Sequence, residues 1–349
     1  NKAGGVSENR GIFKVNAVLT MVGNIGQTFR QSDGTLEVPS SFAVPQSTFE
    51  FNGGNITGDG IVITNGTLVI GEGSEGTGRF TTHGSSTLVG DIAAAQHILI
   101  QAFNATSTLT SPTSFTNAGR IDMRWDRGTN GHAAALAVTQ GVLTNSGIIQ
   151  TFGDGVSAPR VITASLTNTS AGSVVIGTLT TFNKANAVYE NHGTFTLNGP
   201  ATFSVGAGQL FRQVGGTLTA TGAMTLNGQT FEAVGGTIVG RPIINDGMLR
   251  FVDGCTGTGE FSVRGANAKL DGDIPAGYTV RLNTNSSVTT VLTSAEGYTN
   301  AGTIEMQPGG SGSNNGTGTQ LAITTGALEN SGTIRVLGDA VGGTGRLFK

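Results

Sequence analysis

The chain repeats itself with an offset of about 182 residues, and this repeat limits the folds open to it more than any other feature. "FTNAGRIDM" begins at Phe115 and "YTNAGTIEM" begins at Tyr298. Longer stretches keep the same order and nearly the same offset: "NKAGGVSENRGIF" at 1–13 with "NKANAVYENHGTF" at 183–195, "FRQSDGTL" at 29–36 with "FRQVGGTL" at 211–218, and "TFEFNGGNITG" at 48–58 with "TFEAVGGTIVG" at 230–240. We therefore expect a first unit, 1–182, and a second, incomplete unit, 183–349, continuous with the first.

A shorter phrase, Asn-x-Gly followed by alternating apolar residues, recurs within each unit. Asn and Gly tolerate left-handed backbone conformations, and the alternation that follows has the period of a half-buried strand. The phrase therefore predicts a turn followed by a short strand. The asparagines expected at structural turn positions are Asn9, Asn117, Asn145, Asn191, Asn300 and Asn330.

Short strands with this spacing suit a β-sandwich array, a β-propeller or a parallel β-helix. A propeller blade needs about 40–50 residues with its own signature, which we do not find. A sandwich usually has Trp or Tyr anchors, whereas this chain has one Trp and three Tyr. We therefore expect an all-β fold, a right-handed parallel β-helix (β-solenoid) built from two tandem units of about 182 residues.

Residues 20 positions apart should then lie on neighbouring coils. Phe29 and Phe49, like Phe211 and Phe231, are expected to stack. Arg30 with Glu50, and Arg212 with Glu232, are expected to form ion pairs between coils.

Composition excludes several classes of function. Only 12% of the residues are charged, against about 25% in a typical soluble domain, and the formal net charge is −3. The few Lys and Arg residues are scattered, which argues against a nucleic-acid partner. No run of 18 apolar residues occurs, so we expect no membrane span. Cys255 is the only cysteine, so no internal disulfide can form.

The charged residues mostly recur in both units, whereas a catalytic site is normally built once. We therefore predict no catalytic residues and no enzymatic activity, and we interpret the recurring charges as structural or solvated groups. The recurring pairs are Lys2/Lys184, Glu8/Glu190, Arg30/Arg212, Glu50/Glu232, Asp91/Asp273, Asp122/Glu305, Asp154/Asp339 and Arg160/Arg346.

Cofactor and metal motifs are equally sparse. Gly71, Gly73 and Gly76 match Gly-x-Gly-x-x-Gly, but no helix-forming sequence follows, so we predict a glycine-rich turn and no cofactor site. The four histidines lack metal-ligand spacing, so no metal-ligating residue is predicted. Weak calcium binding stays open at the acidic loops, which carry Glu72, Glu75, Asp271 and Asp273.

Trp125 is the one candidate for a contact that occurs only once. The first unit carries "MRWDRG" at 123–128 where the second has "MQPGGS" at 306–311. An exposed indole can stack on a sugar ring. We therefore predict a carbohydrate contact at Trp125.

The repeated phrases "TNAGTI", "NSGTI" and "NHGTF" resemble the large repetitive surface proteins of bacteria. These include filamentous haemagglutinin-like and autotransporter-passenger adhesins, which have a pectin-lyase-like β-helix. The resemblance is one of repeat style over nearly all the chain, and it carries no functional residues. It implies an exported, elongated scaffold, outside the cell or at its surface, for adhesion or matrix building.

Two functions of different classes follow. The first is an extracellular structural or adhesive repeat protein, a fragment of a longer chain, that forms a rod or fibre. Its partners would be further copies, head to tail and possibly side by side, and possible surface glycans. The alternative is a carbohydrate-binding or polysaccharide-cleaving β-helix. Ice binding would need regular Thr-x-Thr rows, and "TLTATG" at 217–222 is not sustained.

Overall fold

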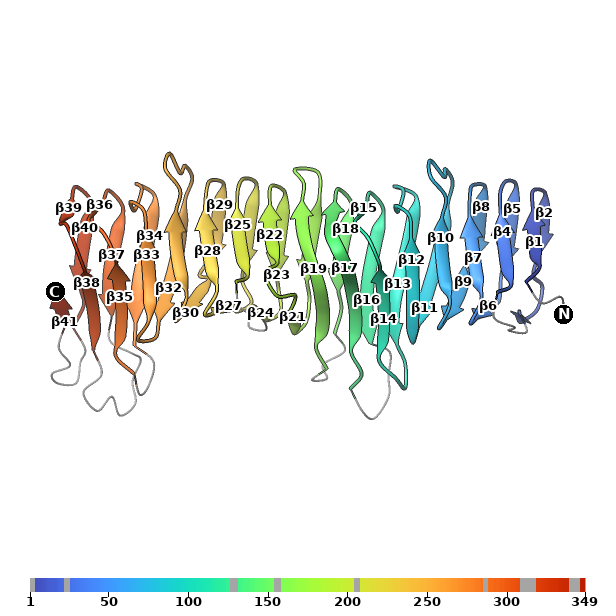
Figure 1. Ribbon diagram of the computed structural model, residues 1–349, viewed down its shortest axis with the longest axis horizontal. Helices are drawn as coiled ribbons and strands as arrows, with labels where there is room; N and C mark the ends of the chain where they lie inside the picture. Colours follow the sequence, from blue (N-terminus) through green and yellow to red (C-terminus); the bar gives the residue numbers. More distant parts are fainter. Residues whose placement is uncertain are drawn as a thin grey trace. The chain divides into compact units, whose positions relative to one another are not determined.

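The structure is a computed structural model, and it describes residues 4–21, 26–125, 131–153, 158–203, 208–284, 288–307, 318–338 and 346–348. Within these residues there is no helix, and more than half of them lie in strands. No described helix is therefore long and apolar enough to cross a membrane. The chain divides into two compact units, Asn1–Phe182 and Asn183–Lys349 (Figure 1). The division falls where the sequence begins its second copy.

Unit 1 consists of short strands joined by turns. They are β1 (Val6–Asn9), β2 (Ile12–Lys14), β3 (Leu19–Thr20), β4 (Thr28–Gln31), β5 (Thr35–Val38), β6 (Phe42–Pro45), β7 (Thr48–Phe51), β8 (Asn55–Gly58), β9 (Ile61–Thr64), β10 (Thr67–Ile70), β11 (Gly78–His83), β12 (Ser85–Val89), β13 (Gln96–Ala102), β14 (Ser107–Ser111), β15 (Phe115–Asn117), β16 (Arg120–Trp125), β17 (Ala134–Asn145), β18 (Ile148–Thr151), β19 (Arg160–Asn168), β20 (Ser173–Ile176) and β21 (Thr180–Phe182).

Unit 2 has the same kind of strands. They are β22 (Val188–Asn191), β23 (Thr194–Leu197), β24 (Ala201–Phe203), β25 (Leu210–Gln213), β26 (Thr217–Ala220), β27 (Met224–Asn227), β28 (Thr230–Ala233), β29 (Thr237–Gly240), β30 (Ile243–Asn245), β31 (Met248–Phe251), β32 (Gly259–Arg264), β33 (Ala268–Asp271), β34 (Tyr278–Asn283), β35 (Thr290–Ser294), β36 (Tyr298–Asn300), β37 (Thr303–Gln307), β38 (Thr319–Ile323), β39 (Leu328–Asn330), β40 (Thr333–Val336) and β41 (Arg346–Phe348).

Each unit is a β-solenoid, because each strand pairs in parallel with the strand one coil further along the chain. In unit 1, one ladder runs through β1, β4, β7, β10, β12, β14, β17 and β19, and another through β6, β9, β11, β13, β16 and β18. In unit 2, the matching ladders run through β22, β25, β28, β31, β33, β35 and β38, and through β27, β30, β32, β34, β37 and β40. The expected all-β parallel solenoid is confirmed.

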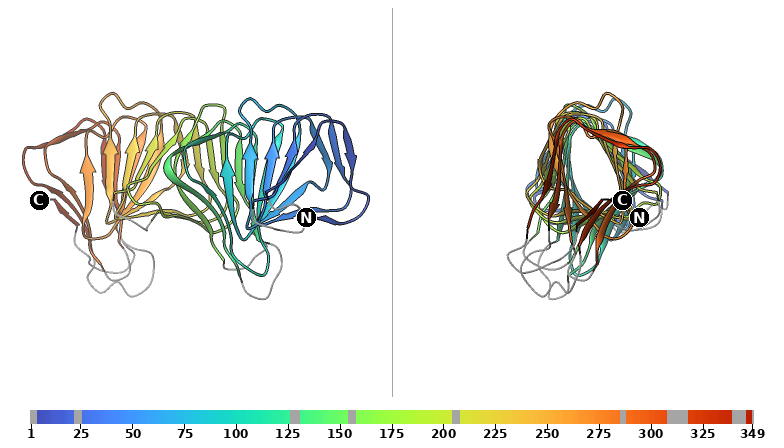
Figure 2. Two further views of the ribbon diagram at one scale, coloured as in Figure 1. Left: turned by 45° about the vertical axis from the view of Figure 1, so that its right-hand side comes forward. Right: turned by 90° about the vertical axis from the view of Figure 1, so that its left-hand side faces the viewer.

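The core follows from strict alternation along the strands. In β7, Phe49 and Phe51 are buried while Thr48 and Glu50 lie outside. Because parallel pairing keeps register, inward residues form columns that extend from coil to coil. Figure 2 shows the strands of successive coils lying one behind another within each unit.

The predicted aromatic stacks are part of these columns. The rings of Phe29 and Phe49 are stacked with centroids 5.7 Å apart, and those of Phe211 and Phe231 are stacked at 5.3 Å. Each pair consists of directly opposite residues in neighbouring coils. The spacing of 20 residues therefore predicted the ring contacts themselves, in addition to the length of a coil.

Candidate functional site

The six asparagines of the recurrent phrase all occupy the last position of a strand, immediately before the turn. These strands are β1, β15, β17, β22, β36 and β39. All six lie in the described part of the chain, and none has a positive φ. Any left-handed conformation in the turn that follows is therefore adopted by other residues.

Their side chains instead form ladders of hydrogen bonds between coils. Asn117 Nδ2 donates to Asn145 Oδ1 at 2.7 Å, and Asn145 Nδ2 donates to Asn168 Oδ1 at 2.8 Å. In unit 2, Asn300 Nδ2 donates to Asn330 Oδ1 at 2.7 Å. The asparagines inside the ladders are fully buried, where an amide without a partner would be costly. Their role is to hold adjacent coils in register.

The same ladder takes glutamine as its second member near the start of each unit. Asn9 Nδ2 donates to Gln31 Oε1 at 2.8 Å, and Asn191 Nδ2 donates to Gln213 Oε1 at 3.0 Å. The two units thus repeat individual hydrogen bonds as well as sequence.

Charged residues form columns on the outside of the coils. In unit 1, Arg30 Nη2 lies 2.9 Å from Glu50 Oε2. In unit 2, Arg212 bridges Glu190 and Glu232, so both predicted ion pairs are confirmed. The unit 2 column then continues with alternating sign, because Arg250 contacts Glu232 at 3.3 Å and Asp271 at 2.7 Å.

Three of the remaining recurrent charges also have structural partners. Asp91 Oδ1 accepts the backbone N–H of Thr116 at 2.6 Å, and Asp273 Oδ1 accepts that of Thr299 at 2.6 Å. Arg160 is buried and donates to the carbonyl oxygens of Ala158 and Phe152. Lys2, Asp154 and Asp339 lie outside the described residues.

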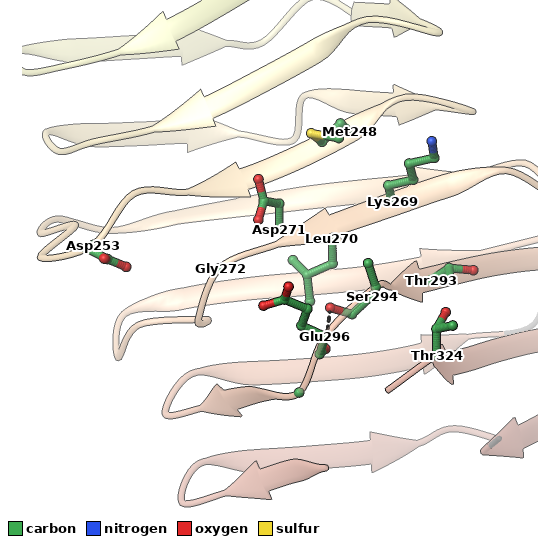
Figure 3. Close-up of a pocket in the computed structure, with 12 residues that line it drawn as sticks. Met248, Asp253, Lys269, Leu270, Asp271, Gly272, Thr293, Ser294, Glu296 and Thr324 are labelled. Atoms are coloured by element: carbon green, nitrogen blue, oxygen red, sulfur yellow. Dashed lines mark hydrogen bonds between the residues drawn. The ribbon is translucent and has the colours of Figure 1, made fainter. Parts of the chain in front are cut away.

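Unit 2 contains a hollow of about 600 Å³ whose charged lining recurs only in part in unit 1. Lys269, Asp271 and Glu296 line it together with Asp253, and in Figure 3 Asp253 and Lys269 lie toward opposite sides of the view. Ser294 Oγ donates to the backbone carbonyl of Glu296 at 2.8 Å, which fixes the local turn.

Of the matching positions in unit 1, one is also acidic, since Glu72 stands where unit 2 has Asp253, and the others are uncharged. Because Leu249 pairs with Leu270 as Leu68 pairs with Leu88, Thr87 and Val89 stand where unit 2 has Lys269 and Asp271. Lys269, Asp271 and Glu296 are therefore additions to the repeated scaffold.

The acidic loops and the glycine-rich motif singled out in the sequence lie in the described part of the chain. No group of three His, Cys, Asp or Glu side chains that could hold a metal ion occurs among them. Asp271 is engaged by Arg250 and Asp273 by a backbone amide, which leaves the suggested calcium loop without a set of ligands. Gly73 and Gly76 have positive φ and lie between β10 and β11, so this glycine-rich stretch is a turn between strands.

Trp125 is buried, with only 4% of its surface exposed. It is the last residue of β16, on the same inward side as Ile121 and Met123. An indole in this position cannot present its face to a sugar ring, so the predicted carbohydrate contact at Trp125 is wrong.

The sequence analysis missed a basic outward face on β11, β13 and β16 of unit 1. Asp122 is its single acidic group, and it accepts contacts from His97 Nε2 at 2.9 Å and from Arg120 Nε at 2.8 Å. We call this surface the basic face, and its outward residues are Arg79, Thr81, His83, His97, Leu99, Gln101, Arg120, Asp122 and Arg124. The alternation along each strand marks these residues as outward-facing, but only the register of strand pairing brings them together.

Comparison with known proteins found no counterpart. No protein-family model, no curated protein and no solved structure matches the chain.

Proposed function

We propose that the chain is a non-catalytic, extracellular or cell-surface structural and adhesive repeat protein of bacterial type. It would extend head to tail into a fibre through right-handed coils. The observation that carries this proposal is the open core at the first coil of unit 1 and at the last full coil of unit 2.

At the first coil, Phe13 occupies a core column but is 37% exposed, whereas its partner on the next coil, Leu36, is fully buried. At the last full coil of unit 2, Val336 is 52% exposed, whereas its partner Met306 is fully buried. These side chains are apolar and inward-facing, and they are more exposed than their partners on the neighbouring coil. A further coil stacked on either surface would remove them from solvent.

The last asparagine of the unit 2 ladder also has fewer hydrogen bonds than the one before it. Among the residues that the structure describes, Asn330 Nδ2 donates only to the carbonyl of Gly332, at 3.3 Å, whereas Asn300 donates both to Asn330 and to the carbonyl of Thr333. Strand edges with free donors and acceptors are templates for pairing with another chain. A second copy would supply both the apolar contacts and the missing ladder partner.

The outer surface supports lateral packing as a secondary mode. Many of the described cations lie next to an acid on the same or the next coil, as in Arg30–Glu50 and Lys14–Glu37. A surface with little net charge offers little repulsion to a neighbouring fibre.

Electron microscopy and light scattering at rising protein concentration test the proposal. We expect filaments much longer than one chain, and Phe13→Ser and Val336→Ser should each shorten them. Val239→Ser is the matched control, because Val239 is 48% exposed and points outward from an inner coil. A monomer at every concentration would refute the proposal.

The hollow in unit 2 favours one alternative, a carbohydrate-binding or polysaccharide-cleaving protein. Asp253 and Glu296 lie in it without an ion pair to a described residue, and glycoside hydrolysis uses two carboxyl groups. Turnover of a polysaccharide panel that is abolished by Glu296→Gln and Asp253→Asn would establish this alternative. Absence of turnover leaves the structural proposal in place.

A further inference from the structure

The basic face of unit 1 differs from the equivalent surface of unit 2 in its charge. Arg79 pairs in register with His97, and His97 with Arg120. In unit 2, the same register joins Glu260 to Thr279, and Thr279 to Thr303. The two surfaces can therefore be compared position by position.

Unit 1 has a surplus of cationic groups on this surface, whereas unit 2 is balanced. The basic face carries three arginines and two histidines against one aspartate. The equivalent nine residues of unit 2 carry two arginines and two glutamates, and they are Glu260, Ser262, Arg264, Thr279, Arg281, Asn283, Thr303, Glu305 and Gln307. There, Arg281 Nη1 lies 2.5 Å from Glu305 Oε2 and also contacts Glu260 through Nε.

The surplus cationic groups of the basic face are accessible to solvent. Arg79 is exposed and forms no ion pair with a described residue, and the side chain of Arg120 is 39% exposed. Asp122 is already held between His97 and Arg120, so it leaves Arg79 uncompensated. Elsewhere in unit 1, the cations Arg10, Lys14 and Arg30 each have an acidic partner.

The geometry points to the basic face as a binding surface for an extended polysaccharide that carries carboxylates, such as a polyuronate. Arg79, His97 and Arg120 lie on successive coils, about 4.8 Å apart, and so form a regular row. A polyuronate presents a carboxylate on every sugar, so several anionic groups can engage the row at once. Guanidinium groups match carboxylates in shape and charge.

The neutral residues of the basic face favour a glycan over other polyanions. Thr81 and Gln101 are partly exposed and can bond to sugar hydroxyls. The face has no Phe, Tyr or Trp side chain on which a nucleic-acid base could stack. Leu99 is its only apolar side chain, which is too little for insertion into a lipid surface.

This inference rests on the proposed adhesive function, since it names the partner to which the protein would adhere. The test is binding of the full chain to an oligogalacturonate, measured by calorimetry at two salt concentrations. The fully methyl-esterified oligomer, a DNA duplex and anionic phospholipid vesicles serve as comparisons. We expect binding of the free acid that weakens with salt, and none of the ester.

Residues of unit 2 can be placed at the matching positions of unit 1, because the same fold already carries them there. Arg79→Glu and His97→Thr install the residues that unit 2 has at these positions, and we expect each to weaken binding about tenfold. Arg10→Gln is the control, because Arg10 is a highly exposed arginine of unit 1 outside the basic face. Its affinity should equal that of the parent chain.

Equal affinity of Arg79→Glu and the parent chain would overturn the inference, as would tighter binding of DNA or of vesicles. Lack of any oligogalacturonate binding would overturn it too. Filament formation is scored separately in the same samples. Filaments without glycan binding would refute only the inference, and glycan binding without filaments would refute only the proposed assembly.

Discussion

Cys255 Sγ lies 3.6 Å from Tyr278 Oη inside unit 2, at the positions that Ser74 and Gln96 occupy in unit 1. In unit 1, Gln96 Nε2 donates to Ser74 Oγ at 3.2 Å. Both members of the pair differ between the units, yet each version joins two neighbouring coils by a buried polar contact. The two repeats have thus diverged together at sites that touch.

The position of Cys255 predicts slow reaction with thiol reagents. Burial raises the pKa of the Cys255 thiol, and the reactive thiolate is correspondingly scarce. Tyr278→Ala removes the ring that packs against Phe251 and Phe261, and it should raise the labelling rate by about tenfold or more. Tyr278→Phe keeps the ring and should label much more slowly than Tyr278→Ala. Labelling of the folded parent chain as fast as in urea would contradict this account.

The asparagine ladder predicts a large cost for one small substitution. Asn145 accepts from Asn117 and donates to Asn168 and to the carbonyls of Gly147 and Ser173. Asn145→Ala leaves several of these buried groups without a partner, and we expect a loss of about 2 to 4 kcal/mol in the free energy of unfolding of unit 1.

Fluorescence provides the measurement, because the single tryptophan, Trp125, is buried in unit 1. Urea titrations that follow Trp125 should show the midpoint falling for Asn145→Ala. Asn52→Ala is the control, since Asn52 is exposed, and it should change stability by only about 0.5 kcal/mol. Equal midpoints for the two variants would show that the ladder contributes little.

Sequence predicted the coils well because their causes are local. Alternating apolar residues and turn glycines are visible in any window of ten residues, and the repeat gives the spacing that brings Phe29 onto Phe49. The same alternation predicts an inward position for Trp125, because it follows Ile121 and Met123 at intervals of two residues. The expectation of an exposed indole ignored that alternation.

The roles of the ladder asparagines and of the basic face could not be predicted in the same way. The partner of Asn117 is Asn145, 28 residues later, and the partner of Asn9 is Gln31, 22 residues later. Coil length varies between these pairs, so only the folded register shows which side chains meet. Arg79, His97 and Arg120 likewise become one row only after the strands are paired.

The tyrosines predict how unit 2 responds to alkali. Tyr189, Tyr278 and Tyr298 are the three tyrosines of the chain, all belong to unit 2, and all are buried. Burial raises the pKa of each phenol above its ordinary value. The unfolded chain loses these protons at about pH 10. The stabilisation is therefore complete below that pH, and it declines as the pH rises towards the folded pKa.

Absorbance of the phenolate form measures this response. We expect no phenolate signal from the folded chain as the pH passes 10, followed by a cooperative rise when unit 2 unfolds. Tyr298→Phe should retain more stability at high pH than the parent chain. A gradual, non-cooperative titration of all three tyrosines near pH 10 would mean that they are open to solvent.

The ion pair between Arg30 and Glu50 predicts the opposite trend for unit 1 in acid. Burial alone would raise the pKa of Glu50, but hydrogen bonds from Arg30 and Asn52 outweigh it and hold that pKa below its ordinary value. A carboxylate of lowered pKa stabilises the fold above its unfolded pKa, about 4.3. That contribution is lost as the pH falls through the folded pKa.

Glu50→Gln should therefore lower the stability of unit 1 near neutral pH and make little difference at about pH 3. Arg30→Gln removes the main donor, and it should flatten the acid dependence in the same way. Thr87→Val, an uncharged outward change on a later coil of the same ladder, is the control and should leave that dependence unchanged. Urea midpoints followed by Trp125 fluorescence between neutral pH and about pH 3 provide the measurement. A constant difference between Glu50→Gln and the parent chain across that range would show that Glu50 acts through packing, because a lost ion pair must become irrelevant once the carboxyl is protonated.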